Sequence, residues 1–301
     1  MTETPTMSQT PDAVAHEAIR RVGVVGSGLM GSGIAEVCAR AGLDVVVREV
    51  NPEAARAGEH RVTSSLDRAV RRGKLAEEER DAAVRRLRFT TDLAELADRD
   101  LVVEAIAEDE GAKAELFAAL DKTVTRDDAI LASNTSSIPI MKLGMATGRP
   151  ETVVGVHFFN PVPVLDLVEL VPSLLTAEQT LVRAEEFVDG SLGKHVIRSK
   201  DRAGFVVNAL LVPYLLSAIR MLESGFASPE DIDSGMELGC AHPMGPLRLA
   251  DLIGLDTLAA IAASMYEEFK EPLHSAPPLL LRMVDAGLLG RKSGRGFHNY
   301  A

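Results

Sequence analysis

Short runs of β-branched and other apolar residues alternate with longer helix-like stretches over the first two thirds of the chain. This alternation is typical of a parallel sheet whose strands are joined by crossover helices. The runs predicted to form strands are 22–25, 45–48, 87–90, 101–104, 130–133 and 153–157, and two later runs, 166–171 and 195–197, could extend the sheet. The helices predicted between them cover 30–41, 52–72, 77–86, 112–122 and 177–192.

The pattern changes near residue 200, where apolar helical stretches replace the alternation. Residues 205–223 are almost continuously apolar and too long for a strand, and Pro213 should kink that helix. Ser228 and Pro229 indicate a helix start, with the serine as N-cap. Two more apolar helices are predicted at 247–269 and 279–288. We therefore expect a doubly wound α/β domain over 18–199 and an all-helical domain over 200–301, preceded by a disordered tail at 1–17.

Composition narrows the function classes. The hydrophobic fraction of 46% and the charged fraction of 25% are ordinary for a globular protein. A net charge of −12 argues against nucleic-acid binding, which needs a basic surface. Cys38 and Cys240 lie far apart, and no signal-like or bilayer-length apolar segment is apparent, so we expect a cytoplasmic protein without a membrane partner. The histidines and cysteines lack ligand spacing, so no metal is expected.

The segment 26–31, Gly-Ser-Gly-Leu-Met-Gly, follows the first predicted strand and opens the first predicted helix. In this pattern Gly26 allows a tight turn, Gly28 lets the backbone approach a pyrophosphate, and Gly31 permits close helix–strand packing. Glu49 ends the second strand, where an acidic residue accepts hydrogen bonds from the adenine ribose. The order predicts a Rossmann-type dinucleotide site. A carboxylate repels the extra phosphate of NADP, which favours NAD, but Arg48 could pair with that phosphate and keeps NADP open.

His157 ends a predicted strand at the carboxyl edge of the sheet, where open α/β folds bind ligands. A proline-containing loop then reverses the chain, and the next apolar run carries one carboxylate, Glu169. A buried carboxylate needs a partner, and a return strand of this length can bring Glu169 beside His157. Such a pair suits general base catalysis, because the carboxylate holds the imidazole tautomer. A purely structural hydrogen bond is the alternative.

Residues 133–137, Ser-Asn-Thr-Ser-Ser, end the fifth strand at the same edge. They supply small hydroxyl and amide donors where a nicotinamide and a substrate oxygen would meet. The alternative is a polar turn in which one of the last two serines caps a helix that starts at Ile138. Two other histidines, His274 and His298, lie among proline, serine and glycine residues and are expected to be exposed.

These motifs together resemble those of the short-chain L-3-hydroxyacyl-CoA dehydrogenases, including the bacterial 3-hydroxybutyryl-CoA dehydrogenases. The resemblance covers about residues 21–300. The stretches that carry it are 26–31, 133–137, His-Phe-Phe-Asn-Pro-Val-Pro at 157–163, Asp-Arg-Ala-Gly-Phe-Val-Val-Asn at 201–208 and Pro-Met-Gly-Pro at 243–246.

The resemblance implies an NAD-dependent enzyme that oxidises the hydroxyl of a short (S)-3-hydroxyacyl-CoA, or reduces the ketone. It makes His157 the general base, with Glu169 as its orienting partner, and lets Ser136 and Asn208 bind the reacting oxygen or the histidine. It also implies a homodimer formed through the helical domain, whose apolar stretches exceed what a small lone domain could hide. Besides the glycine turn, it places NAD contacts at Glu108, Lys113, Ser136, Asn160 and Lys292.

A basic helix face offers a site for coenzyme A. Arg61, Ser65, Arg68 and Arg72 recur at spacings of three and four, so they share one face of the predicted helix 52–72. The face could meet the phosphates of CoA, and a solvated helix face is the alternative. Ser65 matches a substrate contact of the family. Arg72 stands where the family pattern has a lysine, and a phosphate would accept either side chain.

Three other functions share some of these motifs. A dehydrogenase of a free hydroxy acid or sugar acid would not need the basic face. A non-catalytic NAD-binding or structural protein would not need His157, Glu169 and Ser136. A domain detached from a multifunctional fatty-oxidation protein is less compatible with the tail and the full helical domain predicted here.

Overall fold

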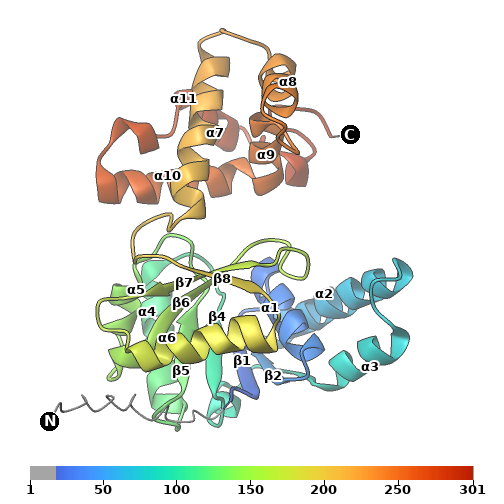
Figure 1. The fold of residues 1–301 in the computed structure, drawn as a ribbon, viewed down its shortest axis with the longest axis vertical. Helices are drawn as coiled ribbons and strands as arrows, with labels where there is room; N and C mark the ends of the chain where they lie inside the picture. The colour runs from blue at the N-terminus through green and yellow to red at the C-terminus, as the bar shows by residue number, and fades with distance from the viewer. Residues whose placement is uncertain (1–17, 301) are drawn as a thin grey trace, which may run out of the picture.

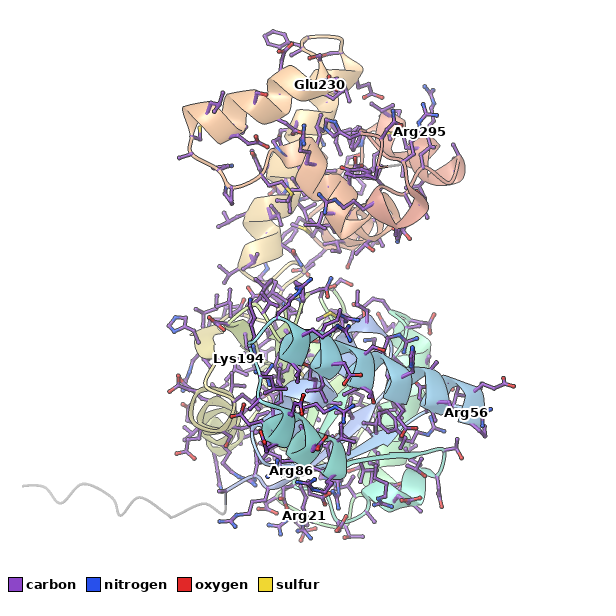
Figure 2. The ribbon with its side chains drawn as sticks, turned by 90° about the vertical axis from the view of Figure 1, so that its right-hand side faces the viewer. Arg21, Arg56, Arg86, Lys194, Glu230 and Arg295 are labelled. Atoms are coloured by element: carbon purple, nitrogen blue, oxygen red, sulfur yellow. The ribbon has the colours of Figure 1, made fainter. Side chains whose placement is uncertain are left out.

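The computed structural model describes residues 18–300, and the tail predicted at 1–17 lies outside them. A sheet flanked by helices forms one part of the molecule, and a group of helices forms the other (Figure 1). The side-on view shows the same division, with Glu230 and Arg295 on the helical part and Arg21 at the far end of the sheet part (Figure 2). The predicted fold class, a Rossmann-type α/β domain followed by a helical domain, is confirmed.

The sheet has eight strands in the order β3-β2-β1-β4-β5-β6-β7-β8. The strands from β3 to β6 are parallel, β7 is antiparallel to β6, and β8 is parallel to β7. The strand order reverses between β1 and β4, and ligands bind at such points in open sheets. All eight predicted runs are strands, at Arg21–Val25 (β1), Asp44–Arg48 (β2), Leu87–Thr90 (β3), Leu101–Glu104 (β4), Ile130–Ser133 (β5), Val153–Phe158 (β6), Leu167–Pro172 (β7) and His195–Arg198 (β8).

Each face of the sheet packs against its own helices because side chains alternate along buried strands. In β4, Leu101 and Val103 join one apolar core, while Val102 joins the other. The first core includes side chains of α1 (Leu29–Arg40), α2 (Pro52–Arg71), α3 (Glu77–Arg85) and α6 (Glu178–Glu185). The second includes those of α4 (Glu110–Thr123) and α5 (Ile140–Gly144). The helix predicted at 177–192 changes after α6 to a wider π-helical turn, Glu186–Ser191.

The helical domain consists of α7 (Val207–Glu223), α8 (Pro229–Gly239), α9 (Pro246–Ile253), α10 (Leu255–Phe269) and α11 (Pro278–Asp285). Pro213 lies within α7, which continues through it, and Ser228 caps α8 as predicted. The prediction of one helix over 247–269 is wrong. Gly254 has φ +100°, which ends α9, and α10 begins at an angle of 95° to it. Over the described residues no single helix is long and apolar enough to cross a membrane, and only this bent pair passes on length and composition.

Residues 297–300 are hydrogen-bonded to the helical domain through two buried carboxylates, Asp233 and Asp251. Asp251 accepts hydrogen bonds from the amides of Phe297 and His298 and from the hydroxyl of Tyr300, each at 2.9 Å. Asp233 lies 2.7 Å from Nε2 of His298. The prediction that His298 is exposed is therefore wrong, since its side chain keeps 10% of its exposure. His274, also predicted to be exposed, keeps 7% and packs against a phenylalanine ring.

The segment between the two domains is bonded to both. The carboxylate of Asp201 accepts the amides of Ile140 and Met141 at 2.8 Å and so caps α5. The alternative in which a serine of 133–137 caps a helix from residue 138 is therefore wrong. Arg202 pairs with Glu268 of α10 at 3.1 Å, which fixes the next residue of the segment to the helical domain.

Candidate active site between the two domains

The glycine turn after β1 has the geometry that its sequence predicts. Gly26 has φ +91°, and a Cβ there would lie 2.6 Å from the carbonyl oxygen of Ala105. A Cβ on Gly31 would clash with the carbonyl oxygen of Gly26, so α1 packs closely on the turn. A Cβ on Gly28 would meet nothing within 4 Å. The turn is therefore tight on its inner side and open where a pyrophosphate would approach.

Glu49 lies directly after β2 and is bonded to the same turn. Its Oε1 accepts the amide of Ser27 at 2.5 Å and the Ser27 hydroxyl at 2.8 Å. Burial acts to raise the pKa of Glu49, but the hydrogen bonds from Ser27 outweigh it and the pKa is lowered. An ionised carboxylate thus stands beside the turn, as ribose recognition requires. The neighbouring Arg48 has its Nε buried with no hydrogen-bond partner among the described residues.

A cavity of 540 Å³ opens between the glycine turn and α10. Its walls come from four segments that are far apart in the sequence, so it exists only because the two domains face each other. The lining residues include Gly28, Leu29, Met30, Glu108, Lys113, Asn134, Ser136, Asp256 and Ile261.

The two remaining cofactor residues from the sequence, Asn160 and Lys292, are not among the lining residues of this cavity. Asn160 follows β6 and is exposed. Lys292 lies outside the set of lining residues, but its ammonium bonds both carboxylate oxygens of Asp256, which is one of them. The structure thus brings most of the predicted NAD contacts to one place.

Lys113 and Glu108 form an ion pair on the cavity wall. The Nζ of Lys113 lies 2.8 Å from Oε2 of Glu108, whose Oε1 accepts the amide of Ser136 at 3.2 Å and the hydroxyl of Ser137 at 3.0 Å. Burial opposes ionisation of Glu108, but the charge of Lys113 prevails and lowers its pKa. Glu108 therefore shapes the loop that carries Ser136.

The same lysine bonds a residue that sequence reasoning missed. The Nζ of Lys113 also lies 2.8 Å from Oε1 of Glu104, the last residue of β4, which is fully buried. A single carboxylate in an apolar run was the signal that drew attention to Glu169, and Glu104 is likewise the single carboxylate of the run Leu-Val-Val-Glu.

His157 and Glu169 lie opposite each other on the antiparallel strands β6 and β7. Nδ1 of His157 is 2.7 Å from Oε2 of Glu169, and the two residues keep 6% and 0% of their exposure. The rings of Phe159 and Phe205 pack edge-on against the imidazole at 4.6 and 5.4 Å. No described residue hydrogen-bonds to Nε2, which leaves that nitrogen to a ligand. The arrangement can take up a proton at Nε2 while the carboxylate stabilises the resulting charge.

Glu169 also contacts the helical domain. Its Oε1 accepts the amides of Val206 and Val207, at 3.0 and 2.9 Å, where α7 begins. Asn208 follows directly in the first turn of α7 and is half-buried. The helical domain therefore brings the backbone next to Asn208 into contact with Glu169.

The basic face of α2 is partly engaged within the protein. Arg61 donates to the carbonyl oxygen of Ser27 at 2.5 Å, so this face borders the glycine turn. Ser65 hydrogen-bonds the buried Glu36, whose carboxylate also feels the charge of Arg68. Arg72 is exposed and caps α2 rather than lying within it.

Comparison with known proteins decides the family. The family model of the 3-hydroxyacyl-CoA dehydrogenase NAD-binding domain matches residues 21–202, and that of the C-terminal domain matches residues 204–300. The chain belongs to the 3-hydroxyacyl-CoA dehydrogenase family. It is accordingly an oxidoreductase with NAD as its cofactor.

Relatives of this dehydrogenase agree with that assignment. A 3-hydroxybutyryl-CoA dehydrogenase of Mycobacterium tuberculosis is 63% identical over 284 residues, which cover 94% of this chain and 99% of that protein. The crystal structure of M. tuberculosis FadB2 superposes with a TM-score of 0.94 at 63% identity, covering 95% of this chain and all of that one. The crystal structure of (S)-3-hydroxybutyryl-CoA dehydrogenase PaaH1 from Ralstonia eutropha superposes with a TM-score of 0.89 at 45% identity. The match covers 94% of this chain and 100% of that one. The resemblance stated from sequence is confirmed.

Proposed function

We propose that this dehydrogenase interconverts (S)-3-hydroxybutyryl-CoA and acetoacetyl-CoA. The observation that carries the proposal is the buried pair of His157 and Glu169, bonded across two strands and to the start of α7. The C4 acyl group is supported by the names of the two relatives that match the chain over nearly their whole length.

In the proposed oxidation, Nε2 of His157 removes the proton of the 3-hydroxyl. Glu169 holds the other ring nitrogen and stabilises the imidazolium that forms. Ser136 and Asn208 hold the reacting oxygen from opposite domains. NAD, when bound, accepts the hydride from C3 of the substrate. In the reverse direction the imidazolium returns its proton to the oxygen.

The residues present fit NAD. Gly28 leaves the turn open to a pyrophosphate, and Glu49 presents an ionised carboxylate for ribose hydroxyls. We assign the wall of the cavity between the domains to the rest of the cofactor. The residues assigned to it are Glu108, Lys113, Ser136, Asn160 and Lys292.

We further propose that the basic face of α2 binds the CoA moiety through Ser65 and Arg72. Arg72 is exposed, so its guanidinium is free to meet a phosphate. Arg61 links the same face to the glycine turn, which places it beside the dinucleotide site.

The division at residues 199 and 200, the cytoplasmic location and the homodimer are part of the same proposal. Three large apolar side chains of the helical domain, Leu210, Phe226 and Leu238, keep 74%, 79% and 88% of their exposure, and a second subunit would cover such surface. Sedimentation at micromolar concentration should give twice the mass of one chain. A monomer at that concentration would contradict the dimer without affecting the chemistry.

Steady-state oxidation of NADH with acetoacetyl-CoA and with free acetoacetate tests the proposed function. Remote contacts to CoA should raise kcat/KM for the thioester about 100-fold or more above that for the free acid. NADPH should replace NADH poorly. Equal kcat/KM for the thioester and the free acid would favour the alternative enzyme, a dehydrogenase of free hydroxy acids.

A further inference from the structure

Lys113 occupies an unfavourable position for a charged side chain. It lies in the first turn of α4 and keeps only 1% of its exposure. Burial disfavours its ammonium, and the positive end of the helix dipole disfavours it further. Two carboxylates offset these costs, because Glu104 and Glu108 each lie 2.8 Å from Nζ. Glu108, on the cavity wall, already pairs with Lys113. The second carboxylate, Glu104, must therefore serve another purpose.

The carboxylate of Glu104 accepts three hydrogen bonds. Its Oε1 accepts the amide of Ile106 at 2.7 Å as well as the lysine ammonium. Its Oε2 accepts the hydroxyl of Ser133 at 2.6 Å, and Ser133 is its register partner on β5. The carboxylate is thus fixed by two strands, a turn and a helix. It is fully buried and lies outside the set of residues that line the cavity.

A continuous chain of charged hydrogen bonds runs from Glu104 to the loop that carries Ser136. Glu104 bonds Lys113, Lys113 bonds Glu108, and Glu108 accepts from the Ser136 amide, the Ser137 hydroxyl and the hydroxyl of Thr135. Lys113, Glu108 and Ser136 all line the cavity. The charged path from Glu104 to a bound cofactor therefore runs through Lys113, whereas its bonds to the Ile106 amide and the Ser133 hydroxyl are to neutral groups.

We propose that Glu104 is a positioning residue for NAD: it fixes the ammonium of Lys113, which fixes Glu108 and the Ser136 loop in the form that binds the cofactor. The inference rests on the proposed function for the cofactor assignment of this cavity. It adds a residue that touches neither cofactor nor substrate.

The test is a double-mutant cycle read by NADH binding in the absence of any acyl-CoA. Glu104→Gln keeps the shape but removes the charge, and it should weaken NADH binding about tenfold, the loss of a hydrogen bond to a charged group. In a Lys113→Met background the same substitution should change the dissociation constant less than about twofold, because the charged path from Glu104 to the cofactor is gone.

Asp100→Asn is the matched control. Asp100 is also a buried carboxylate that accepts backbone amides, but it directly precedes β4, at the opposite end of the strand from Glu104. The Asp100→Asn substitution should lower the melting temperature of the protein without changing its NADH dissociation constant. If Glu104→Gln does not fold, Glu104→Asp, which withdraws the carboxylate by one methylene, enters the same cycle.

Three results would overturn the proposal: wild-type NADH affinity in the Glu104 variant, an equal loss in the Lys113→Met background, or an equal loss in Asp100→Asn. The experiment measures cofactor binding. If the protein proves not to act on a CoA thioester, the proposed role of Glu104 is therefore unaffected. Wild-type protein that binds no NADH would instead refute the proposed function.

Discussion

Glu169 lies 2.7 Å from His157 and uses its other carboxylate oxygen to bind the first amides of α7. The two residues face each other on β6 and β7, which belong to the α/β domain, while α7 belongs to the helical domain. The amides at the helix start thus hold the carboxylate from the side opposite the imidazole. The orientation of the imidazole therefore depends on both domains being in place.

Glu169→Gln should lower kcat with acetoacetyl-CoA about 100-fold or more, since the tautomer is lost. If the glutamine oxygen accepts the α7 amides, its NH₂ group faces Nδ1 and favours the ring tautomer that is protonated on Nε2. That nitrogen can then no longer take a proton. Steady-state kinetics and the NADH dissociation constant check this, and a variant with nearly normal kcat would show that the carboxylate does not orient the base.

Glu49→Ala should shift cofactor preference toward NADP. Removal of the carboxylate relieves its repulsion of the 2′-phosphate. Arg48, whose Nε has no hydrogen-bond partner within residues 18–300, can then bind this phosphate. We expect the ratio of kcat/KM for NADH to that for NADPH to fall about tenfold or more. Glu53→Ala, an exposed change in the first turn of α2, is the control. An unchanged ratio would remove Glu49 from the ribose site.

The free energy of unfolding of Glu36→Gln, relative to that of the wild type, should increase as the pH rises. Burial raises the pKa of the Glu36 carboxyl above 4.5, and the Ser65 hydrogen bond and the charges of Arg40 and Arg68 offset this only in part. A pKa raised on folding gives stability that is complete below pH 4.5 and is lost as the pH rises through the folded value. A glutamine has no such loss.

Urea unfolding of the wild type and Glu36→Gln between pH 4.5 and pH 8 measures this effect. The exposed substitution Glu78→Gln should show no such trend. A stability difference that stays constant with pH would mean that Glu36 ionises as easily in the folded protein as in the unfolded chain.

Asp251→Asn should destabilise the helical domain by about 2–4 kcal/mol, because two amides and a hydroxyl lose a buried charged acceptor. Tyr300→Phe removes one of these three hydrogen bonds and should cost about 1 kcal/mol. The free energy of unfolding in urea measures both. If the asparagine variant were as stable as the wild type, the contacts of Asp251 with residues 297–300 would contribute nothing to folding.

The parts of the fold that the sequence predicts are those set by local pattern. The strands at 87–90, 101–104 and 130–133 have the predicted bounds, because each is a short run with a polar residue next to at least one of its ends. The predicted helix over 247–269 fails at Gly254, since its apolar spacing continues through the glycine and gives no sign of the 95° bend.

Contacts between distant segments explain the other differences. His298 was expected to be exposed because its neighbours are small and polar, but its partners Asp233 and Asp251 come from helices 65 and 47 residues earlier. His157 and Glu169 could be paired from sequence because only the loop 159–166 separates their strands. Glu104 could not be paired with Lys113 in this way, because its partner lies on a helix whose rotation about its axis sequence alone does not set.

The most direct test of the proposed chemistry is the turnover of His157→Gln with acetoacetyl-CoA and NADH, measured together with its NADH dissociation constant. Loss of the base should reduce kcat about 1,000-fold while NADH binding stays nearly unchanged, because the imidazole contacts Glu169 and two phenylalanine rings rather than the glycine turn. Turnover within about tenfold of the wild type would contradict the assignment of His157 as the base.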